Sequence, residues 1–494
     1  VHSSRGLMMY KGSSLSSLGG QLSVGLTEGR PSGSVAQKEM NEKKVLKCSS
    51  TEEIAVEGGG PQTKKYMSFA LLTFLGLVAM FGPVQGTMYT VAVRDIQETF
   101  NASLAIVGLT LSIFLWCAAI GPIPTGPAAD HFGRRPVLMV GLAFFILGSF
   151  LCATSSTVWE LLAWRAVQGL GYAICSVIPS TVVSDMVPKE EKGSYIGIIW
   201  FYIFLGPGIG PLLGGYMTEY FGWRSNFIFL GAWSSLMMLW CPLQLKETKG
   251  LNCDQRTQKP KSSNSKLQAI TMLRDMQVAR PVLCGSLLFG TLWGTSFLYP
   301  QILYDVYGYP PSVVGIMIIL RSVGAMLGTI LTRRLNDKIG PKPVAKLTAV
   351  FTSIFCIMMG ATVGEHISSV LVALFCFGFT AASCLGAVES LLVKEFPGKA
   401  PFVVACLQFS IKIVAAIFVT VIGAVVEKAG YQLILYTLGI VCFCGSIPIM
   451  FCDKRVEAAN DPEKPDIGMS SVAKENIKED KCGIDEIRNE ATSS

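Results

Sequence analysis

Blocks of about twenty apolar residues, separated by short polar segments, recur along the sequence between residues 66 and 452. A helix of that length crosses the hydrocarbon core of a bilayer, where unpaired backbone N–H and C=O groups are too costly for an open structure. The composition agrees, because 51% of the 494 residues are hydrophobic and only 15% are charged. The sequence therefore predicts an all-α membrane protein. The twelve predicted spans are 66–93, 105–125, 137–153, 160–182, 194–216, 226–245, 281–304, 312–332, 344–362, 369–393, 402–425 and 431–451.

A basic, polar segment at 246–280 divides the spans six and six. The halves carry related loops, since "DHFGRRP" (130–136) after the second span matches "DKIGPKP" (337–343) after the eighth. Such repeats build transporters with a site between two bundles at the bilayer midplane, and they weigh against a channel. We therefore expect twelve transmembrane helices in two pseudo-symmetric six-helix bundles. The predicted parts are a disordered cytosolic N-terminal tail (1–65), an N-terminal bundle (66–245), a cytosolic central loop (246–280), a C-terminal bundle (281–452) and a cytosolic C-terminal tail (453–494).

Positive charge is concentrated on one side of the predicted membrane. The loops on that side hold most of the Lys and Arg residues between the spans, whereas the other side has only Arg94, Arg224 and Lys428. The positive-inside rule then places both termini in the cytosol. We expect a multi-pass protein of the plasma membrane, with the vacuole as an open alternative. No nucleic-acid partner is expected, because the basic residues frame the spans and form no patch with interleaved aromatic residues.

Metal, cofactor and catalytic chemistry find no support in the sequence. The three histidines, His2, His131 and His366, lie outside the spans. The fifteen cysteines form no CxxC motif or pairing pattern, and we interpret them as small apolar packing residues. No cluster of nucleophile, base and acid is apparent. The sequence therefore predicts no enzyme, no cofactor and no metal site.

The segment "GPAADHFGRRP" (126–136) combines glycines, an acid and two arginines in what we expect to be a tight loop. Its acid can accept from a guanidinium or cap a helix, while its arginines stay charged and can tie spans two and three to a neighbour in one conformation. The alternative is an ordinary inner loop that gathers arginine. The predicted gate residues are Gly126, Asp130, Gly133, Arg134 and Arg135, with Asp337 and Gly340 in the second half.

The fifth span contains "GIIWFYIFLGPGIGPLLGG" (197–215), with six glycines and two prolines. Gly206, Gly210 and Gly214 recur every four residues, so they lie on one stripe where a neighbouring helix can approach closely. Pro207 and Pro211 repeat beside them and predict a kink.

These motifs resemble signatures of the major facilitator superfamily. The loop 126–136 resembles the family's loop signature, and "LLAWRAVQGLGYA" (161–173) resembles its fourth-helix motif. The glycine-rich span is similar to the antiporter motif of drug:proton antiporters, G-x8-G-x3-GP-x2-GG, whose positions are all filled, by Gly197, Gly206, Gly210, Pro211, Gly214 and Gly215. "GPVQGTMY" (82–89), "FGWRSNFIFL" (221–230) and "VKEFPGKA" (393–400) resemble fungal multidrug exporters of the quinidine-resistance type. The resemblance implies a monomeric, proton-coupled exporter of drug-like or metabolite organic molecules that works by alternating access.

Two charged residues within spans are the candidates for proton coupling. Arg165 lies in span four, where a charge costs at least about 2.5 kcal/mol, and the resemblance assigns it the coupling role. Since guanidinium does not release its proton, a carboxylate must be the carrier, and Glu389 in span ten is the predicted one. The alternatives are a snorkelling arginine and a glutamate in a salt bridge near the cytosolic face.

Aromatic and polar side chains in several spans could line a cavity for flat, lipophilic molecules. Packing and interface anchoring are the alternative roles of aromatic residues in spans. The candidate cavity residues are Trp116, Gln168, Trp200, Trp293, Phe297 and Lys412.

Other functions stay open at this point. A porter for polyamines, organic acids or other small metabolites has the same architecture, and a non-transporting sensor is a more remote alternative. The expected partners are a small organic substrate, protons and the lipid bilayer.

Overall fold

The computed structural model describes residues 67–188, 191–248, 276–396 and 400–450, so both predicted tails and most of the central loop lie outside the described residues. Within these ranges every regular element is a helix. The first half contains α2 (Phe69–Ala79), α3 (Phe81–Phe100), α4 (Leu104–Ile120), α5 (Pro122–Phe132), α6 (Arg134–Thr154), α7 (Val158–Met186), α8 (Lys192–Phe221) and α9 (Arg224–Gln244). The second half contains α11 (Met276–Asp305), α12 (Pro311–Ile339), α13 (Pro341–Thr362), α14 (Ile367–Glu395), α15 (Ala400–Ala429) and α16 (Tyr431–Met450).

The number of candidate membrane spans in the described residues is eleven, or twelve if the bent pair α4 and α5 forms one span. The predicted all-helical membrane fold is confirmed. The bend of 44° between α4 and α5 follows Gly121 and coincides with Pro122, which has no N–H to continue the helix. The prolines Pro207 and Pro211, where the sequence predicts a kink, lie within the single helix α8.

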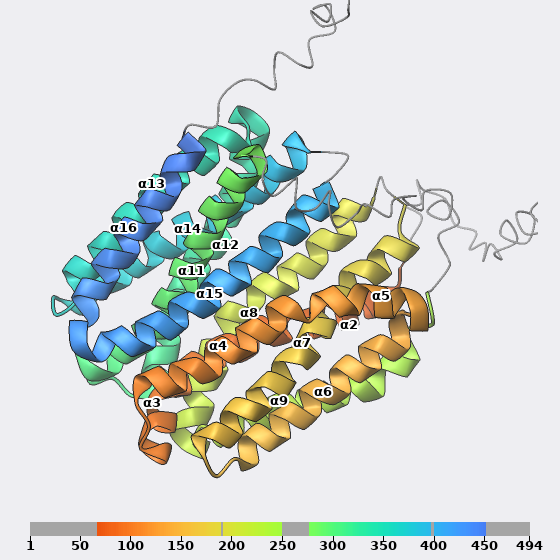
Figure 1. The fold of residues 1–494 in the computed structure, drawn as a ribbon, viewed down its shortest axis with the longest axis horizontal. Coiled ribbons are helices and arrows are strands. Elements are labelled where there is room, and N and C mark those ends of the chain that lie inside the picture. The colour runs from red at the N-terminus through yellow and green to blue at the C-terminus, as the bar shows by residue number, and fades with distance from the viewer. Residues whose placement is uncertain (1–66, 189–190, 249–275, 397–399, 451–494) are drawn as a thin grey trace, which may run out of the picture. The chain divides into compact units, whose positions relative to one another are not determined.

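The two most extensive helix contacts between the halves of the described chain are α4 with α15 and α8 with α12. Figure 1 shows α4 beside α15, and α8 packs along α12. Because the chain alternates direction, the turns at 101–103, 155–157, 222–223, 306–310, 363–366 and 430 share one end of the helices, which we call the Asn101 end. The turns at 133 and 340 share the other, the Gly133 end.

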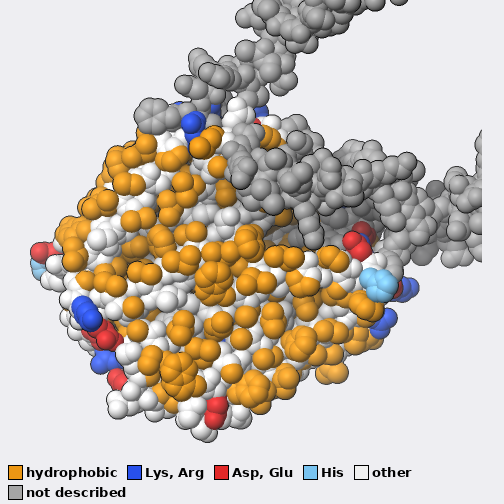
Figure 2. Space-filling view, in the orientation of Figure 1, with side chains coloured by type: hydrophobic (Ala, Val, Ile, Leu, Met, Phe, Trp, Pro, Cys, Tyr) orange, Lys and Arg blue, Asp and Glu red, His pale blue; other side chains and the backbone are white. Residues whose placement is uncertain are grey.

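The outer surface of the helices is apolar. Figure 2 shows a face covered by hydrophobic side chains, with charged side chains near its edges. Leu239 and Leu243 of α9, for example, are 73% and 79% exposed. Such exposure of large aliphatic side chains is what a lipid-facing surface requires.

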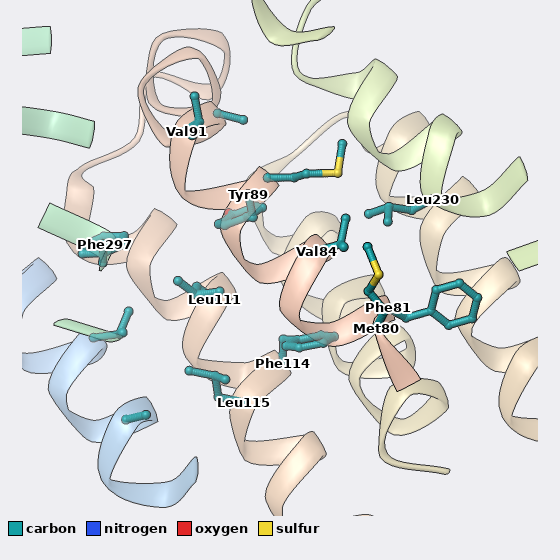
Figure 3. Packing of buried hydrophobic residues seen from close by; sticks show 14 of the residues in the cluster. Met80, Phe81, Val84, Tyr89, Val91, Leu111, Phe114, Leu115, Leu230 and Phe297 are labelled. Carbon is teal, nitrogen blue, oxygen red and sulfur yellow. The ribbon is translucent and has the colours of Figure 1, made fainter. Parts of the chain in front are cut away.

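The interior of the first half is packed with large aromatic and aliphatic side chains (Figure 3). Phe81 of α3 stacks on Phe145 of α6 with ring centroids 4.9 Å apart and meets the edge of Trp233 of α9 at 5.0 Å. Ring pairs of this kind add to the stabilisation from burial, and they fix α3 within its bundle.

The repeated loop is shorter than expected. Residues 126–132 belong to α5 and Asp337 belongs to α12, so the predicted loop around Gly126 and Asp130 is helical. The turn itself is confined to Gly133 and Gly340, whose φ values of 104° and 86° favour glycine. The repeat seen in the sequence therefore corresponds to the same backbone turn in both halves.

Candidate functional site

Arg134, at the start of α6, binds three partners at the Gly133 end. Its Nε donates to Asp185 of α7 at 2.7 Å, and its Nη1 reaches the Ala129 carbonyl at 2.7 Å and the Asp130 carboxylate at 2.9 Å. The side chains of Arg134 and Asp185 are 11% and 10% exposed, whereas Asp130 is 74% exposed. The pair with Asp185 is therefore the one that is shielded from solvent. The sequence predicted a tie to a neighbour, and the structure places that neighbour in the fourth span.

A second acid meets the same turn. The carboxylate of Glu247 accepts from the backbone N–H groups of Arg134 at 2.9 Å and Arg135 at 3.2 Å, which have no partner within the first turn of α6. A Cβ at Gly133 would lie 2.6 Å from Cδ of Glu247. Glycine is thus required at this position both by its φ and by the close approach of the acid. The sequence analysis did not identify Glu247, which lies in the segment assigned to the central loop.

Two other predicted gate residues, Gly126 and Asp337, make no such contacts with the residues described. A Cβ at Gly126 would meet nothing within 4 Å. In the second half Asp337 is exposed, and it forms no hydrogen bond or ion pair with the residues described. The second turn therefore repeats the backbone of the first without its arginine–aspartate tie.

Arg165 of α7 is fully buried inside the first half, which excludes a snorkelling position. Its Nε donates to the Thr110 carbonyl at 3.3 Å and its Nη1 to Oε1 of Gln168 at 2.9 Å. Gln168 in turn donates to Ser149 at 2.8 Å. Gln168, a candidate cavity residue, therefore belongs to the hydrogen-bond chain that positions Arg165.

Aromatic rings supply the rest of the environment of Arg165. Its guanidinium carbon lies 4.2 Å from the ring centre of Tyr89, 4.8 Å from that of Phe114 and 5.9 Å from that of Phe227. No ion pair links it to a carboxylate among the residues described, and Nη2 has no hydrogen-bond partner. Cation–π contacts and neutral acceptors therefore surround this charge.

The charged residues within the second half are also separate from one another. Arg321 of α12 donates to Ser296 of α11, and Lys412 of α15 donates to the Ala118 carbonyl of α4 at 3.3 Å. Glu389 is half-buried on α14, toward the Gly133 end, and has no hydrogen bond or ion pair to the part of the chain that the structure describes. The alternative of a salt-bridged Glu389 is thus not what the structure contains.

The glycine stripe of α8 packs directly on α3. A Cβ at Gly206 would lie 2.8 Å from Cβ of Pro83, one at Gly210 would lie 2.8 Å from the Val84 carbonyl oxygen, and one at Gly214 would lie 2.7 Å from Cα of Met88. The predicted close approach therefore falls within the first half. Gly197, at the start of the motif, faces open space, and a Cβ there would meet nothing within 4 Å.

The other side of the same helix faces the second half. A Cβ at Gly215 would lie 3.2 Å from Cα of Ser312, at the start of α12. Nearby, Ser322 of α12 donates to the Pro207 carbonyl at 2.8 Å. That carbonyl has no partner within α8, because residue 211, four positions on, is a proline without an N–H.

A hydrogen bond of the same kind joins α4 to α15. The Ala118 carbonyl lacks its partner within the helix because residue 122 is Pro122, and Lys412 occupies it from the other half. The α4–α15 and α8–α12 pairs thus both use a carbonyl freed by proline.

Acidic residues close the Asn101 end. Glu219, near the end of α8, accepts from the backbone N–H of Ser312 in α12 at 2.9 Å, and Glu427, near the end of α15, accepts from that of Leu104 in α4 at 2.9 Å. Arg94 of α3 also pairs with Asp305 of α11 at 3.0 Å. In the described part of the chain, the hydrogen bonds between the halves lie at this end or near the middle of the helices, and none joins residues of the Gly133 turns. The sequence analysis did not find Glu427.

The candidate cavity residues are only partly brought together. The indole of Trp293 covers Gly86 of α3, 2.5 Å from a Cβ placed there, and Phe297 is fully buried against Gly108 of α4. Both therefore lie between the halves, as does Lys412. Trp116 is half-buried on α4, and Trp200 packs within α8 against Phe204, with ring centres 5.7 Å apart.

Two joined bundles of membrane helices, with matching contacts between them at equivalent positions, define a class of membrane transport proteins. The chain belongs to the Major Facilitator Superfamily, whose sequence profile matches residues 71–310 and 281–481.

Relatives and solved structures agree with this family. Citrate exporter 1 of Aspergillus niger is 27% identical over 54% of this chain. The aligned region spans only 56% of the length of that relative. Multidrug transporter AQR1 of Candida glabrata is 24% identical over 70% of this chain and 68% of its own length. Multidrug resistance protein Stp of Mycobacterium tuberculosis is 26% identical over 67% of this chain and 70% of its own length. A bacterial homologue of the human lysosomal transporter Spinster has the same fold, with a TM-score of 0.66 at 17% identity over 80% of this chain and 97% of the other.

Proposed function

We propose that the protein is a proton-coupled exporter of small organic molecules that works by alternating access. The observation that carries this proposal is the packing of the antiporter motif on α8. One side of the motif lies on the α3 backbone through Gly206, Gly210 and Gly214, and the other side meets α12 of the second half. A helix that is rigidly fixed to one half can move with it while its other side separates from the partner half.

The proposed orientation places the Gly133 end in the cytosol, with both termini there, in the plasma membrane. The contacts between the halves near the Asn101 end would then close the extracellular side of a monomer. Arg134 and its neighbours form the proposed cytosolic gate. The pair with Asp185 would hold the fourth span to the third until the opposite state forms.

Arg165 and Glu389 are the proposed coupling residues. Arg165 carries a permanent charge without a carboxylate partner in the described residues, so a carboxylate that reaches it in another conformation would be its counter-ion. Glu389 is half-buried and unpaired, as a group that binds and releases a proton during a cycle needs to be.

Export of organic anions is the second candidate. Arg165, Arg321 and Lys412 are cations within spans that have no carboxylate partner among the described residues, and a buried cation favours a negatively charged ligand. A polyamine is itself a cation, so its binding would need acidic side chains at these three positions. Citrate exporter 1 of Aspergillus niger, a relative of this chain, has a name consistent with such cargo.

Flux into proteoliposomes tests both candidates. The purified protein is given a cationic drug, a polyamine or a tricarboxylate, with and without an imposed pH gradient. Gradient-dependent flux of the drug supports the first proposal, and gradient-dependent flux of the tricarboxylate supports the second. Binding without flux of any compound would contradict both and would revive the sensor alternative. The Arg165→Lys protein, if it is inserted normally, should lose gradient-driven flux, and unchanged flux would remove Arg165 from the coupling role.

A further inference from the structure

Three polar side chains of the first half are buried with atoms that lack partners. Gln85 of α3 is 1% exposed, and neither its Oε1 nor its Nε2 has a hydrogen bond. Asn226 of α9 is 3% exposed, and its Oδ1 is unpaired although its Nδ2 donates to Thr218 at 2.8 Å. Nη2 of Arg165 is the third such group. A buried polar group without a partner is costly, so the cluster requires an explanation.

The amides of Gln85 and Asn226 line one small cavity. Its volume is about 10 Å³, close to the smallest space that holds one water molecule, and its other walls include Tyr89, Ala92 and Phe227. A water molecule can accept from Nε2 of Gln85 and donate to Oδ1 of Asn226, whereas an apolar atom could satisfy neither. The chemistry of the walls therefore selects water.

The cavity adjoins Arg165. Tyr89 and Phe227, which form two of its walls, are also two of the aromatic rings that face the guanidinium. A cation with no counter-ion among the described residues is stabilised by a dipole whose negative end points toward it. A water molecule in this cavity can orient its oxygen toward the rings and the guanidinium behind them.

Solvent has a short route to this position. A larger cavity of about 320 Å³ opens at the Asn101 end between the same two helices, lined by Asp95 and Thr99 of α3 and by Trp223 and Arg224 beside them. Trp223 contacts Phe227 with ring centres 6.0 Å apart, so this ring pair separates the open cavity from the enclosed one.

We propose that Gln85 and Asn226 form an internal water-binding site next to the aromatic rings that face the buried charge of Arg165. The site lies inside the first half and is distinct from the surfaces where the halves meet. It does not depend on which molecule is transported or on proton coupling.

Hydroxyl-radical labelling by X-ray radiolysis tests the proposal on the full-length protein in nanodiscs, because it marks side chains next to bound water. Tyr89 and Met88 should be labelled several-fold faster than Tyr299 and Met359, which are residues of the same two types, are equally buried and do not line this cavity. Ala92→Leu, which fills the cavity, should abolish the difference. The matched control Ala163→Leu adds the same volume on an exposed site of α7 and should leave it intact.

A second variant keeps the test decisive if Ala92→Leu does not fold. Gln85→Leu preserves the approximate size of the side chain and removes the donor, and it should also slow the labelling of Tyr89. Equal labelling of Tyr89 and Tyr299 in the unmodified protein would overturn the proposal, as would fast labelling of Tyr89 that persists in the folded Gln85→Leu protein. Neither readout uses transport, so failure here is distinguishable from failure of the proposed function.

Discussion

The hydroxyl of Ser322 donates to the carbonyl of Pro207 at 2.8 Å and thereby joins α12 to α8 across the two halves. The bond exists because Pro211 cannot donate to that carbonyl from within the helix. A carbonyl without a partner is costly at membrane depth. The proline of the antiporter motif thus creates an acceptor that a side chain from the other half satisfies.

This relationship predicts a non-additive pair of substitutions. Ser322→Ala should weaken the closure of the Asn101 end by about 0.5 to 1.5 kcal/mol, because the Pro207 carbonyl loses its partner. In a Pro211→Ala protein the new backbone N–H of residue 211 can donate to the Pro207 carbonyl. Ser322→Ala should then have little effect on the closure. Distances between spin labels at the Asn101 ends of α4 and α12 report the populations of closed and open states.

The control for this pair of substitutions is Thr329→Ala, since Thr329 donates to the Ala325 carbonyl of its own helix at 2.8 Å. Thr329→Ala should leave the populations of the closed and open states unchanged. Equal effects of Ser322→Ala with and without Pro211 would contradict the role assigned to the freed carbonyl.

The acids Glu219 and Glu427 should act as equivalent latches. Each accepts from an N–H in the first turn of a helix of the opposite half, where a negative charge is worth about 0.3 to 1 kcal/mol. Glu219→Gln or Glu427→Gln should shift the spin-label distances modestly toward an open Asn101 end, and the double variant should shift them further.

Glu160→Gln is the matched control for the latches. Glu160 is an exposed acid at the same end that accepts from the backbone N–H of Ser156 in its own half at 2.8 Å. If this change opened the Asn101 end as much as Glu219→Gln, general surface charge rather than the two caps would explain the closure.

The pair of Arg134 and Asp185 should be essential at the Gly133 end. Asp185→Asn removes a shielded charge partner, and Arg134→Lys cannot satisfy Asp185, Asp130 and the Ala129 carbonyl in the same geometry. Both variants should reach the membrane and lose most transport in the proteoliposome assay. Arg135→Lys should be tolerated, because the described structure gives Arg135 only a backbone bond to Glu247. Full activity of Asp185→Asn would show that the tie is dispensable.

The spans and the repeated turn could be predicted from the sequence because apolar length and glycine spacing act locally. Partners that come from distant helices could not. Nothing near Asp185, Glu247 or Glu427 in the chain indicates which helix each one will contact, since that depends on how the bundles pack. The bend at Gly121 and Pro122 had a local signal in the proline, but no prediction was drawn from it.

Glycine substitutions in α8 should separate the working part of the antiporter motif from the rest. A Cβ at Gly214 would lie 2.7 Å from Cα and 3.0 Å from the carbonyl oxygen of Met88, which are backbone atoms that cannot move aside cheaply. Gly214→Ala should therefore separate α8 from α3 and lower both thermal stability in detergent and the rate of flux. Gly197→Ala is the matched control, because nothing lies within 4 Å of its new methyl group and alanine favours a helix by about 1 kcal/mol over glycine. It should keep transport and gain slight stability. Loss of transport in Gly197→Ala would mean that this position is used in the opposite conformation, and normal transport in Gly214→Ala would mean that close packing of α8 on α3 is not required for the cycle.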